Sequence, residues 1–599
     1  MTLIRFLSAC PICLLGFLCA DIPTVSAAEA VVPAQLDPRP FGPDFPGLDG
    51  WATGNWWTKP SATPEAAKAA RQAAAKAGKK RRVPAVPFRL DVPRDEVIAF
   101  ALYTLSVPPG EPERSTLKLS AQLFPLKPGE ANTVRLQIDR GNGWQEVAQA
   151  AVRYPGWDAT FRVESWDATQ TVPYRVRHGD TAMFSGTIRP DPVGKPEIAV
   201  AVLSCNSSRT PGQRQELISG LRAADPDLLF FAGDQTYRHT EHTVGWIEFG
   251  LQFRDVIRDR PTVTIPDDHD VGQANLWGNG GGRATNPAGA SGGYFYPAGY
   301  VNMVQRQQTA HLPDPVDPAP IKGGIGVYFT RLVVGGIDFA ILEDRKFKTG
   351  PDGTIPQMGP RPDHIVDPAY DRKAIDLPAL RLLGKRQLAW LAGWADDWQG
   401  VRAKCALSQT AFCGAVHLHG NPDNRLLADL DCNGWPQAGR KAALRILKRA
   451  GAVHLCGDQH LAVVVQHGID TYRDGPWAFT SPALVNTIYG RWWHPEDEQP
   501  GPNPVPGSPL PWTGDYEDGL GNKITMVAYA NPEDTSDERQ RADGYGITRF
   551  NFSAETVTFE CFPRFATLGA DGKPKQFPGW PVTVPLASPP RPSRQETTR

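Results

Sequence analysis

Residues 198–206 read Ile-Ala-Val-Ala-Val-Leu-Ser-Cys-Asn, a short apolar run that ends in polar residues. Short apolar runs bounded by turn residues are typical of buried β-strands. Ligand groups in open sheets gather at the carboxyl ends of such strands. We therefore expect four distant strand ends to meet and form a metal site. The four polar stretches that follow such runs are Ser204-Cys205-Asn206, Gly233-Asp234-Gln235-Thr236-Tyr237, Asp267-Asp268-His269-Asp270 and Gly457-Asp458-Gln459-His460.

Length and composition indicate an ordinary globular protein of more than one domain. The chain has 599 residues, too many for a single hydrophobic core. Apolar residues make up 41% and charged residues 21%, and the formal net charge is −1. A chain so close to neutrality does not hold nucleic acid or another polyanion by bulk charge.

The first 28 residues have the pattern of a secretory signal peptide. Arg5 precedes an apolar stretch over residues 6–20, and the small residues Ser26-Ala27-Ala28 follow. This order of a basic start, a short apolar core and a small-residue exit predicts cleavage after Ala27 or Ala28. No later run is long enough to span a bilayer, which takes about 20 apolar residues. The sequence therefore predicts a secreted, periplasmic or cell-surface protein without a transmembrane segment.

The rest of the chain divides into four parts by composition. Residues 29–82 form an N-terminal extension that ends in an Ala-rich linker with a basic end. Short strand candidates separated by turn residues recur about every ten residues over 83–192, which predicts a β-sandwich of immunoglobulin or fibronectin type. Strand and helix patterns alternate over 193–565, which predicts an α/β layered domain. Residues 566–599 are Pro-rich and basic, and we expect a loose tail.

Within the α/β part, helical spacing of apolar residues predicts helices over 213–224, 379–398 and 441–449. The runs at 327–334 and 337–342 predict a hairpin across Gly335-Gly336. The Gly- and Pro-rich stretch 275–321 is long for a loop in a compact domain, and such loops are usually lids or insertions.

Six of the nine cysteines remain after removal of the predicted signal peptide. In an oxidising compartment an even set favours disulfides. Cys405 with Cys413, or Cys413 with Cys432, are the local candidates. If Cys205 binds metal, one other thiol stays unpaired.

Taken singly, the polar stretches have ordinary structural explanations. Asp234 could cap a helix with Tyr237 packed beside it, and Cys205 could be a buried core cysteine. The stretch Asp267-Asp268-His269-Asp270 is harder to explain, because three carboxylates repel one another unless a cation or a basic group neutralises them. Together the four stretches favour a metal centre.

The order and strand-end placement of these stretches resemble the calcineurin-like metallophosphoesterase superfamily. Cys205, the Asp234-x-x-Tyr237 pair, Asp268 and Gly457-Asp458-x-His460 resemble its D-type alkaline phosphatase (PhoD-like) branch. Supporting matches are Leu342-Glu-Asp-Arg345 and residues 383–391, and the resemblance covers about residues 83–560. It implies a metallophosphoesterase-type domain of layered sheets and helices that follows an N-terminal β-sandwich.

Carried over residue by residue, the resemblance implies two metal ions. Cys205, Asp234, Tyr237 and His460 would hold one ion, and Asp234, Asp268 and Asp458 would hold the other, with Asp234 bridging. Thiolate and phenolate ligands favour Fe³⁺ at the first position. Oxygen ligands favour Ca²⁺ or another hard divalent ion at the second.

The implied activity is hydrolysis of phosphate mono- or diesters by a hydroxide that two metal ions activate. His269 would lie beside the leaving oxygen as a general acid or hydrogen-bond donor. Arg345 is a candidate for contact with phosphate, unless it forms a salt bridge with Asp344, and Arg283 is a weaker candidate. His417 and His419 occupy the place of another histidine block of the superfamily, although core histidines are as common in such positions.

Two other functions remain open from the sequence. The protein could be a non-catalytic, cell-wall-associated binding protein whose metal is structural, or another exported metallohydrolase. The sequence does not choose among a nucleotide, a phosphodiester polymer, a phospholipid and a simple monoester as substrate.

Overall fold

A computed structural model describes residues 30–54, 56, 86–210, 212–487, 489–570 and 572–587. The predicted signal peptide (1–28) and the Ala-rich part of the predicted linker lie outside these residues. Of the helices in these ranges, none combines the length and the apolar character that a membrane crossing requires.

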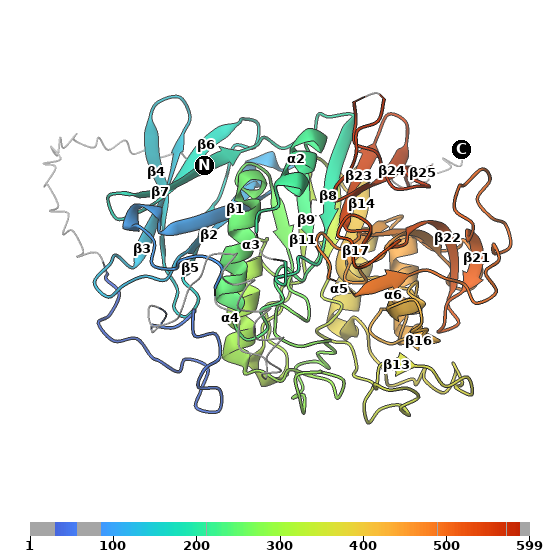
Figure 1. The fold of residues 1–599 in the computed structure, drawn as a ribbon. Coiled ribbons are helices and arrows are strands. Elements are labelled where there is room, and N and C mark those ends of the chain that lie inside the picture. Colours follow the sequence, from blue (N-terminus) through green and yellow to red (C-terminus); the bar gives the residue numbers. More distant parts are fainter. Residues whose placement is uncertain are drawn as a thin grey trace, which may run out of the picture.

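Two antiparallel sheets form the first part of the described chain (Figure 1). Buried and more exposed residues alternate along three strands of the second sheet, as a sheet covered on one face requires, whereas the first strand of the chain is buried along almost its whole length. Their assignment to a β-sandwich of immunoglobulin or fibronectin type stays a prediction. The strands are, in sheet order, β1 (Ile98–Ser106), β2 (Thr116–Leu123) and β5 (Asp158–Val163), and then β4 (Trp144–Ala151), β3 (Thr133–Asp139), β6 (Val172–His178) and β7 (Ala182–Ile188).

Two larger mixed sheets follow. The first has six strands, of which the first three in sheet order are parallel: β10 (Thr262–Thr264), β9 (Leu228–Phe231), β8 (Glu197–Leu203), β23 (Gly544–Asn551), β24 (Thr556–Pro563) and β25 (Val582–Pro585). The second has eight strands: β11 (Thr330–Val334), β12 (Ile337–Ile341), β14 (Ala403–Thr410), β17 (Val453–Gly457), β19 (Trp477–Thr480), β18 (Ala462–His467), β22 (Lys523–Ala530) and β21 (Gly514–Glu517). As predicted, β11 and β12 form an antiparallel hairpin.

The helices and the short elements occupy the outside of these sheets and the connecting segments. The α-helices are α2 (Gln215–Ala224), α3 (His242–Ile257), α4 (Ala298–Thr309), α5 (Gly384–Asp396) and α6 (Gln437–Arg449). Two-stranded ribbons pair β13 (His364–Ile365) with β16 (Ala428–Asp429), and β15 (Leu418–Gly420) with β20 (Gly490–Trp492). Single 3₁₀ turns are η2 (Arg94–Glu96), η3 (Pro112–Arg114) and η4 (Lys322–Gly324).

The two large sheets pack face to face with helices outside them. Val202 and Phe230 of the six-stranded sheet share a fully buried core with Phe339 and Leu455 of the eight-stranded sheet. The opposite face of the six-stranded sheet packs on α3, and the opposite face of the eight-stranded sheet packs on α5 and α6. The protein thus has a mixed α/β fold with several sheets and few helices, as the alternating pattern predicts.

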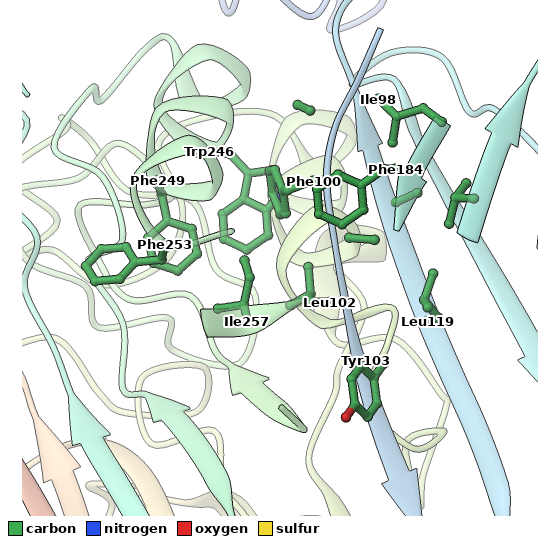
Figure 2. Packing of buried hydrophobic residues seen from close by; sticks show 14 of the residues in the cluster. Ile98, Phe100, Leu102, Tyr103, Leu119, Phe184, Trp246, Phe249, Phe253 and Ile257 are labelled. Carbon is green, nitrogen blue, oxygen red and sulfur yellow. The ribbon is translucent and has the colours of Figure 1, made fainter. Parts of the chain in front are cut away.

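Helix α3 joins the N-terminal sheets to the large sheets. The rings of Phe100 on β1 and Trp246 on α3 meet edge to face with centroids 5.3 Å apart (Figure 2). A Cβ on Gly250 would lie 1.9 Å from the Phe100 ring, so this approach of helix and strand requires glycine. One hydrophobic core therefore continues across residue 192, the predicted domain boundary.

The helix predictions were correct for α2, α5 and α6 within a few residues, whereas α3 and α4 were missed. Of the 16 residues in α3, 13 are buried, so the helix has no polar face and its sequence shows no amphipathic period. Helix α4 lies in the stretch 275–321, which was expected to be a loop.

The predicted loose tail needs correction. Strand β25 pairs antiparallel with β24, and its Val582 and Val584 are buried. The six-stranded sheet thus extends beyond residue 565, because the alternation of valine with polar residues over 582–585 suits an edge strand.

Neither candidate disulfide is formed in the structure. All six cysteines of the described residues are buried and free. Burial in apolar surroundings raises the pKa of the Cys405 and Cys561 thiols well above the usual value, as expected of inert core cysteines.

Candidate metal centre

Three parallel strands of the six-stranded sheet deliver the first side chains of the centre. Cys205 follows β8, Asp234 follows β9, and Asp268 follows β10. A Cβ on Gly233 would lie 2.5 Å from the Cβ of Asp267, so only glycine lets these two strand ends approach so closely.

The fourth strand end comes from the other large sheet. Asp458 directly follows β17, and its backbone N–H donates to the Ser204 hydroxyl over 3.0 Å. A Cβ on Gly457 would lie 2.2 Å from the same hydroxyl oxygen. The glycine therefore serves close approach between the two large sheets.

Four of the converging residues have left-handed backbone conformations. The φ angles are +58° at Cys205, +59° at Asp234, +67° at Asp458 and +56° at His460. Such a conformation costs a non-glycine residue on the order of 1–3 kcal/mol and persists where the surroundings enforce it, most often at functional sites. At all four residues the left-handed conformation takes the chain out of the extended direction of the strand.

The side chains meet as the sequence predicted. The Sγ of Cys205 lies 3.8 Å from Oδ2 of Asp234, and the Tyr237 hydroxyl lies 3.0 Å from Nε2 of His460. Ligand atoms of Cys205, Asp234 and His460 all lie within 4.8 Å of one another, and so do those of Asp267, Asp268 and Asp458. Asp234 and Asp268 form a third such group with His269.

Burial makes this concentration of acids costly without a cation. It raises the pKa of Asp234 well above the usual value, and the neighbouring carboxylates Asp267, Asp270 and Asp458 raise it further. The pKa values of Asp268 and of the Cys205 thiol are raised in the same way, by burial first and by Asp234 second. Bound cations reverse these shifts, because they stabilise the deprotonated donors.

The donor set fits metal ions. Oδ1 of Asp268 and Nδ1 of His460 are buried and have no hydrogen-bond partner. Burial lowers the pKa of His460 to about 3, with a further contribution from Arg491, so its imidazole is neutral and able to ligate. Thiol, phenol, carboxylate and imidazole donors are all within reach of one another.

The centre opens into a cavity of about 310 Å³. We call its first side the strand-tip wall; its members are Asp234, Tyr237, Asp268, His269, Asp458 and His460. We call the second side the loop wall; its members are Arg361, His364, Asp429, Asp431 and Arg491. Cys205 lies beneath the strand-tip wall and is 1% exposed.

His269 reaches the cavity with 23% of its side chain exposed. Its Nδ1 is hydrogen-bonded to the His239 ring, and its imidazole packs at a tilt against the Tyr237 ring with centroids 4.2 Å apart. Burial lowers its pKa well below the usual value, and His239 lowers it further. A neutral His269 can donate a hydrogen bond but has no extra proton to release. Of the two roles expected for it, hydrogen-bond donor suits the structure better than general acid.

The phosphate contact predicted for Arg345 is contradicted by its surroundings. The side chain is 1% exposed, and Nε donates to Asp267 over 2.7 Å. Nη1 pairs with Asp431 at 2.5 Å and Nη2 with Asp458 at 3.0 Å. A substrate phosphate would have to displace a carboxylate to reach this guanidinium, and the predicted alternative pairing with Asp344 is not the one formed.

The weaker candidates lie elsewhere. Arg283 places its guanidinium over the Phe45 ring and is not among the residues that line the cavity. His417 accepts a hydrogen bond from the backbone of His494 and packs on Trp493, as a core histidine does. His419 lies behind the loop wall, close to His364 and Asp429.

Sequence reasoning missed the loop wall. Its residues follow no long apolar run, because they lie on or near two-residue and three-residue strands within long connections. The only local signals are the pairs Asp363-His364 and Asp429-x-Asp431. Neither pair is distinctive without the fold.

Comparison with known proteins finds solved structures of similar fold but no matching family. No protein-family model matches the sequence, and no curated protein matches it. The solved structure "Structure of PhoD" superposes with a TM-score of 0.52 at 12% identity over 82% of this chain and 90% of that chain. Purple acid phosphatase PPD1 from yellow lupin (Lupinus luteus) gives a lower TM-score of 0.46 at 11% identity, over 81% of this chain and 74% of that chain. The PhoD-like fold expected from the strand-end motifs is thus confirmed.

Proposed function

We propose that the protein is a metal-dependent phosphoesterase that hydrolyses phosphate mono- or diesters in the cavity between the two walls. The observation that carries the proposal is the convergence of Cys205, Asp234, Tyr237, Asp268, Asp458 and His460 at one end of that cavity. The PhoD-like fold is consistent with it, because this chain superposes on that structure over 82% of its length.

The predicted ligand assignment is kept as part of the proposal. Cys205, Asp234, Tyr237 and His460 would hold an ion that accepts thiolate and phenolate, for which Fe³⁺ is well suited. Asp234, Asp268 and Asp458 would hold a hard ion such as Ca²⁺. Two bound ions would supply Lewis acidity and would lower the pKa of a water molecule.

The protein's own residues would orient the ester. His269 points a neutral imidazole at the cavity and would hydrogen-bond an ester oxygen. Arg345 would act as a positioning residue, because its guanidinium fixes Asp267 and Asp458 on one side and Asp431 on the other.

We assign the anion contact to Arg491 in place of Arg345. Nε and Nη1 of Arg491 are buried without a hydrogen-bond partner, and the residue lines the cavity. Its guanidinium lies over the Tyr489 ring, which holds it in place. Unpaired guanidinium donors of this kind suit a phosphate oxygen.

The test compares the purified wild-type protein with Asp234→Asn on nitrophenyl phosphate and bis(nitrophenyl) phosphate, with metal content and the optical spectrum measured in parallel. The proposal expects turnover of at least one ester and its loss in the variant, with an unchanged far-ultraviolet circular dichroism spectrum. Equal turnover by both proteins would refute the assignment.

Export is part of the proposal. It is based on the signal-peptide pattern over residues 1–28, and it predicts that the protein isolated from its cells begins at Ala28 or Glu29. N-terminal sequencing checks this, and a mature chain that begins at Met1 would exclude it.

A further inference from the structure

A second group of metal-ligand side chains lies at the loop wall of the cavity. His364, His419 and Asp429 place one ligand atom each so that all three lie within 4.8 Å of one another. None of the three belongs to the strand-tip wall. Two imidazoles and a carboxylate make a donor set that zinc and related divalent ions accept in proteins.

The backbone brings these residues together from three separate segments. His364 on β13 stands directly opposite Asp429 on β16 in an antiparallel pair, so both side chains face the same way. The chain folds back after β15, where Leu418 bridges Arg425 and the Leu426 N–H donates to the His417 carbonyl. This return places the His419 ring against that of His364, with centroids 5.4 Å apart.

The ligand spacing suits a single ion. Nε2 of His419 lies 3.6 Å from Oδ2 of Asp429. Two ligand atoms about 2.0–2.1 Å from a tetrahedral Zn²⁺ are about 3.4 Å apart, so very little movement would close the site. At 3.6 Å the two atoms are too far apart for a good hydrogen bond, so the observed contact does not explain why the residues are together.

The ring nitrogens of His419 are poorly hydrogen-bonded. The side chain is 1% exposed, and neither ring nitrogen makes a hydrogen bond of normal geometry. The carbonyl of Val416 is near enough to act on the ring and raises its pKa slightly, yet burial keeps the pKa well below the usual value. An apolar residue would cost less here, since burying an imidazole without partners is unfavourable.

The carboxylates around the group differ in how their charge is compensated, because Arg491 acts on Asp429 only beyond ion-pair distance. Asp363 pairs with Arg361 at 2.9 Å, and Asp431 pairs with Arg345. Among the described residues Asp429 forms no ion pair with lysine or arginine, although it is only 5% exposed. Arg491 stands opposite His419 across the β15–β20 pair and points into the cavity, where it would face any anion bound there.

We propose that His364, His419 and Asp429 bind a divalent transition-metal ion of the Zn²⁺ class, separate from the strand-tip centre. His364 and Asp429 line the cavity, so the ion is reached from the same space as the strand-tip wall. Hard ions such as Ca²⁺ are excluded by the two imidazoles, which distinguishes this position from the all-carboxylate group at Asp268.

The experiment counts bound Zn²⁺ in a background that lacks the strand-tip centre. The full mature chain carrying Asp234→Asn and His460→Gln is stripped of metal, titrated with Zn²⁺ alone, and analysed by equilibrium dialysis and elemental analysis. We expect one equivalent of Zn²⁺ that excess Ca²⁺ does not displace. Adding His419→Gln should weaken this binding by at least about tenfold.

His417→Gln is the matched control, because His417 is on the same segment, is half-buried, and already accepts a hydrogen bond from the His494 backbone. The His417→Gln variant should still bind one equivalent of Zn²⁺, whereas the Asp429→Asn variant should not bind it. A background protein that binds no Zn²⁺, or a His419→Gln variant that binds it unchanged, would overturn the proposal.

A second measurement does not depend on the folding of the loop-wall variants. X-ray absorption at the zinc edge of the loaded background protein should show nitrogen and oxygen neighbours with imidazole scattering. Sulfur neighbours would place the ion at Cys205 and overturn the proposal. Neither result bears on ester hydrolysis, so this inference and the phosphoesterase function fail separately.

Discussion

The two walls of the cavity are built in different ways. The strand-tip wall stands on the ends of β9, β10 and β17, whose apolar runs are buried between large sheets. The loop wall stands on β13, β16 and β20, which have two or three residues each and lie outside those sheets. Strand ends hold their side chains rigidly, whereas short ribbons depend on cross-strand partners and on the side chains between them.

The two walls also differ in charge. The strand-tip wall combines acids with neutral imidazoles, whereas the loop wall adds two arginines that face the cavity. Arg345 connects them, because it bonds Asp267 and Asp458 on one side and Asp431 on the other. The first wall thus concentrates metal donors, and the second can present positive charge to an ester.

The largest effect should come from a pair of matched substitutions, one on each wall. Asp234→Asn should lower kcat/KM by at least about 10³-fold, or about 4 kcal/mol of transition-state stabilisation. Asp429→Asn should lower it far less, because Asp429 belongs to neither proposed ion of the strand-tip centre. Nitrophenyl ester kinetics measure both, and equal losses would mean that the walls do not have separate roles.

Removing Arg345, which connects the two walls, should lower the free energy of unfolding by nearly as much. Arg345→Met leaves three buried carboxylates without their partner, and breaking a buried ion pair in this way costs about 3–5 kcal/mol. Urea unfolding followed by tryptophan fluorescence checks the loss. A variant as stable as the wild type would show that the walls are held together by other contacts.

A smaller effect should follow from the arginine that faces the cavity. Arg491→Gln should weaken substrate binding by about 1.5–3 kcal/mol, the contribution of a hydrogen bond to a charged group. The loss should appear mainly in KM. Arg361→Gln is the control, since Arg361 is already paired with Asp363. If both variants have the same KM, the assignment of the anion contact to Arg491 is wrong.

The smallest effect concerns pH and a histidine remote from both walls. Burial lowers the pKa of His311 to about 3, against an ordinary value of 6.5. Between these values the unfolded chain binds a proton that the folded chain does not, so stability falls as the pH decreases from 6.5 toward 3.

Removing that imidazole should flatten the pH dependence. The wild type should lose about 1.4 kcal/mol per pH unit below 6.5 from this group, and His311→Gln should lose correspondingly less between pH 7.5 and 5.5. Denaturant midpoints at the two pH values measure the difference. An identical slope in both proteins would assign the acid sensitivity to other groups, including the histidines of the walls.

The sequence by itself determined which residues of the strand-tip wall lie at strand ends. Four short runs end in turn residues, and the polar residues that follow lie at strand ends because a run of buried residues cannot continue into charged ones. The order of the strands and the packing of the two large sheets then bring these residues together. Helices α2, α5 and α6 were also predictable, since each has one apolar face and one polar face.

Only the tertiary structure decided the rest. Helix α3 is buried on nearly all sides, so its sequence has no period to detect, and Val582 and Val584 become part of a sheet only because β24 offers them an edge. The partners of Arg345 come from residues 267, 431 and 458, and those of His419 from 364 and 429. Contacts between segments so far apart depend on how the sheets and loops pack, and no local pattern of residues records that packing.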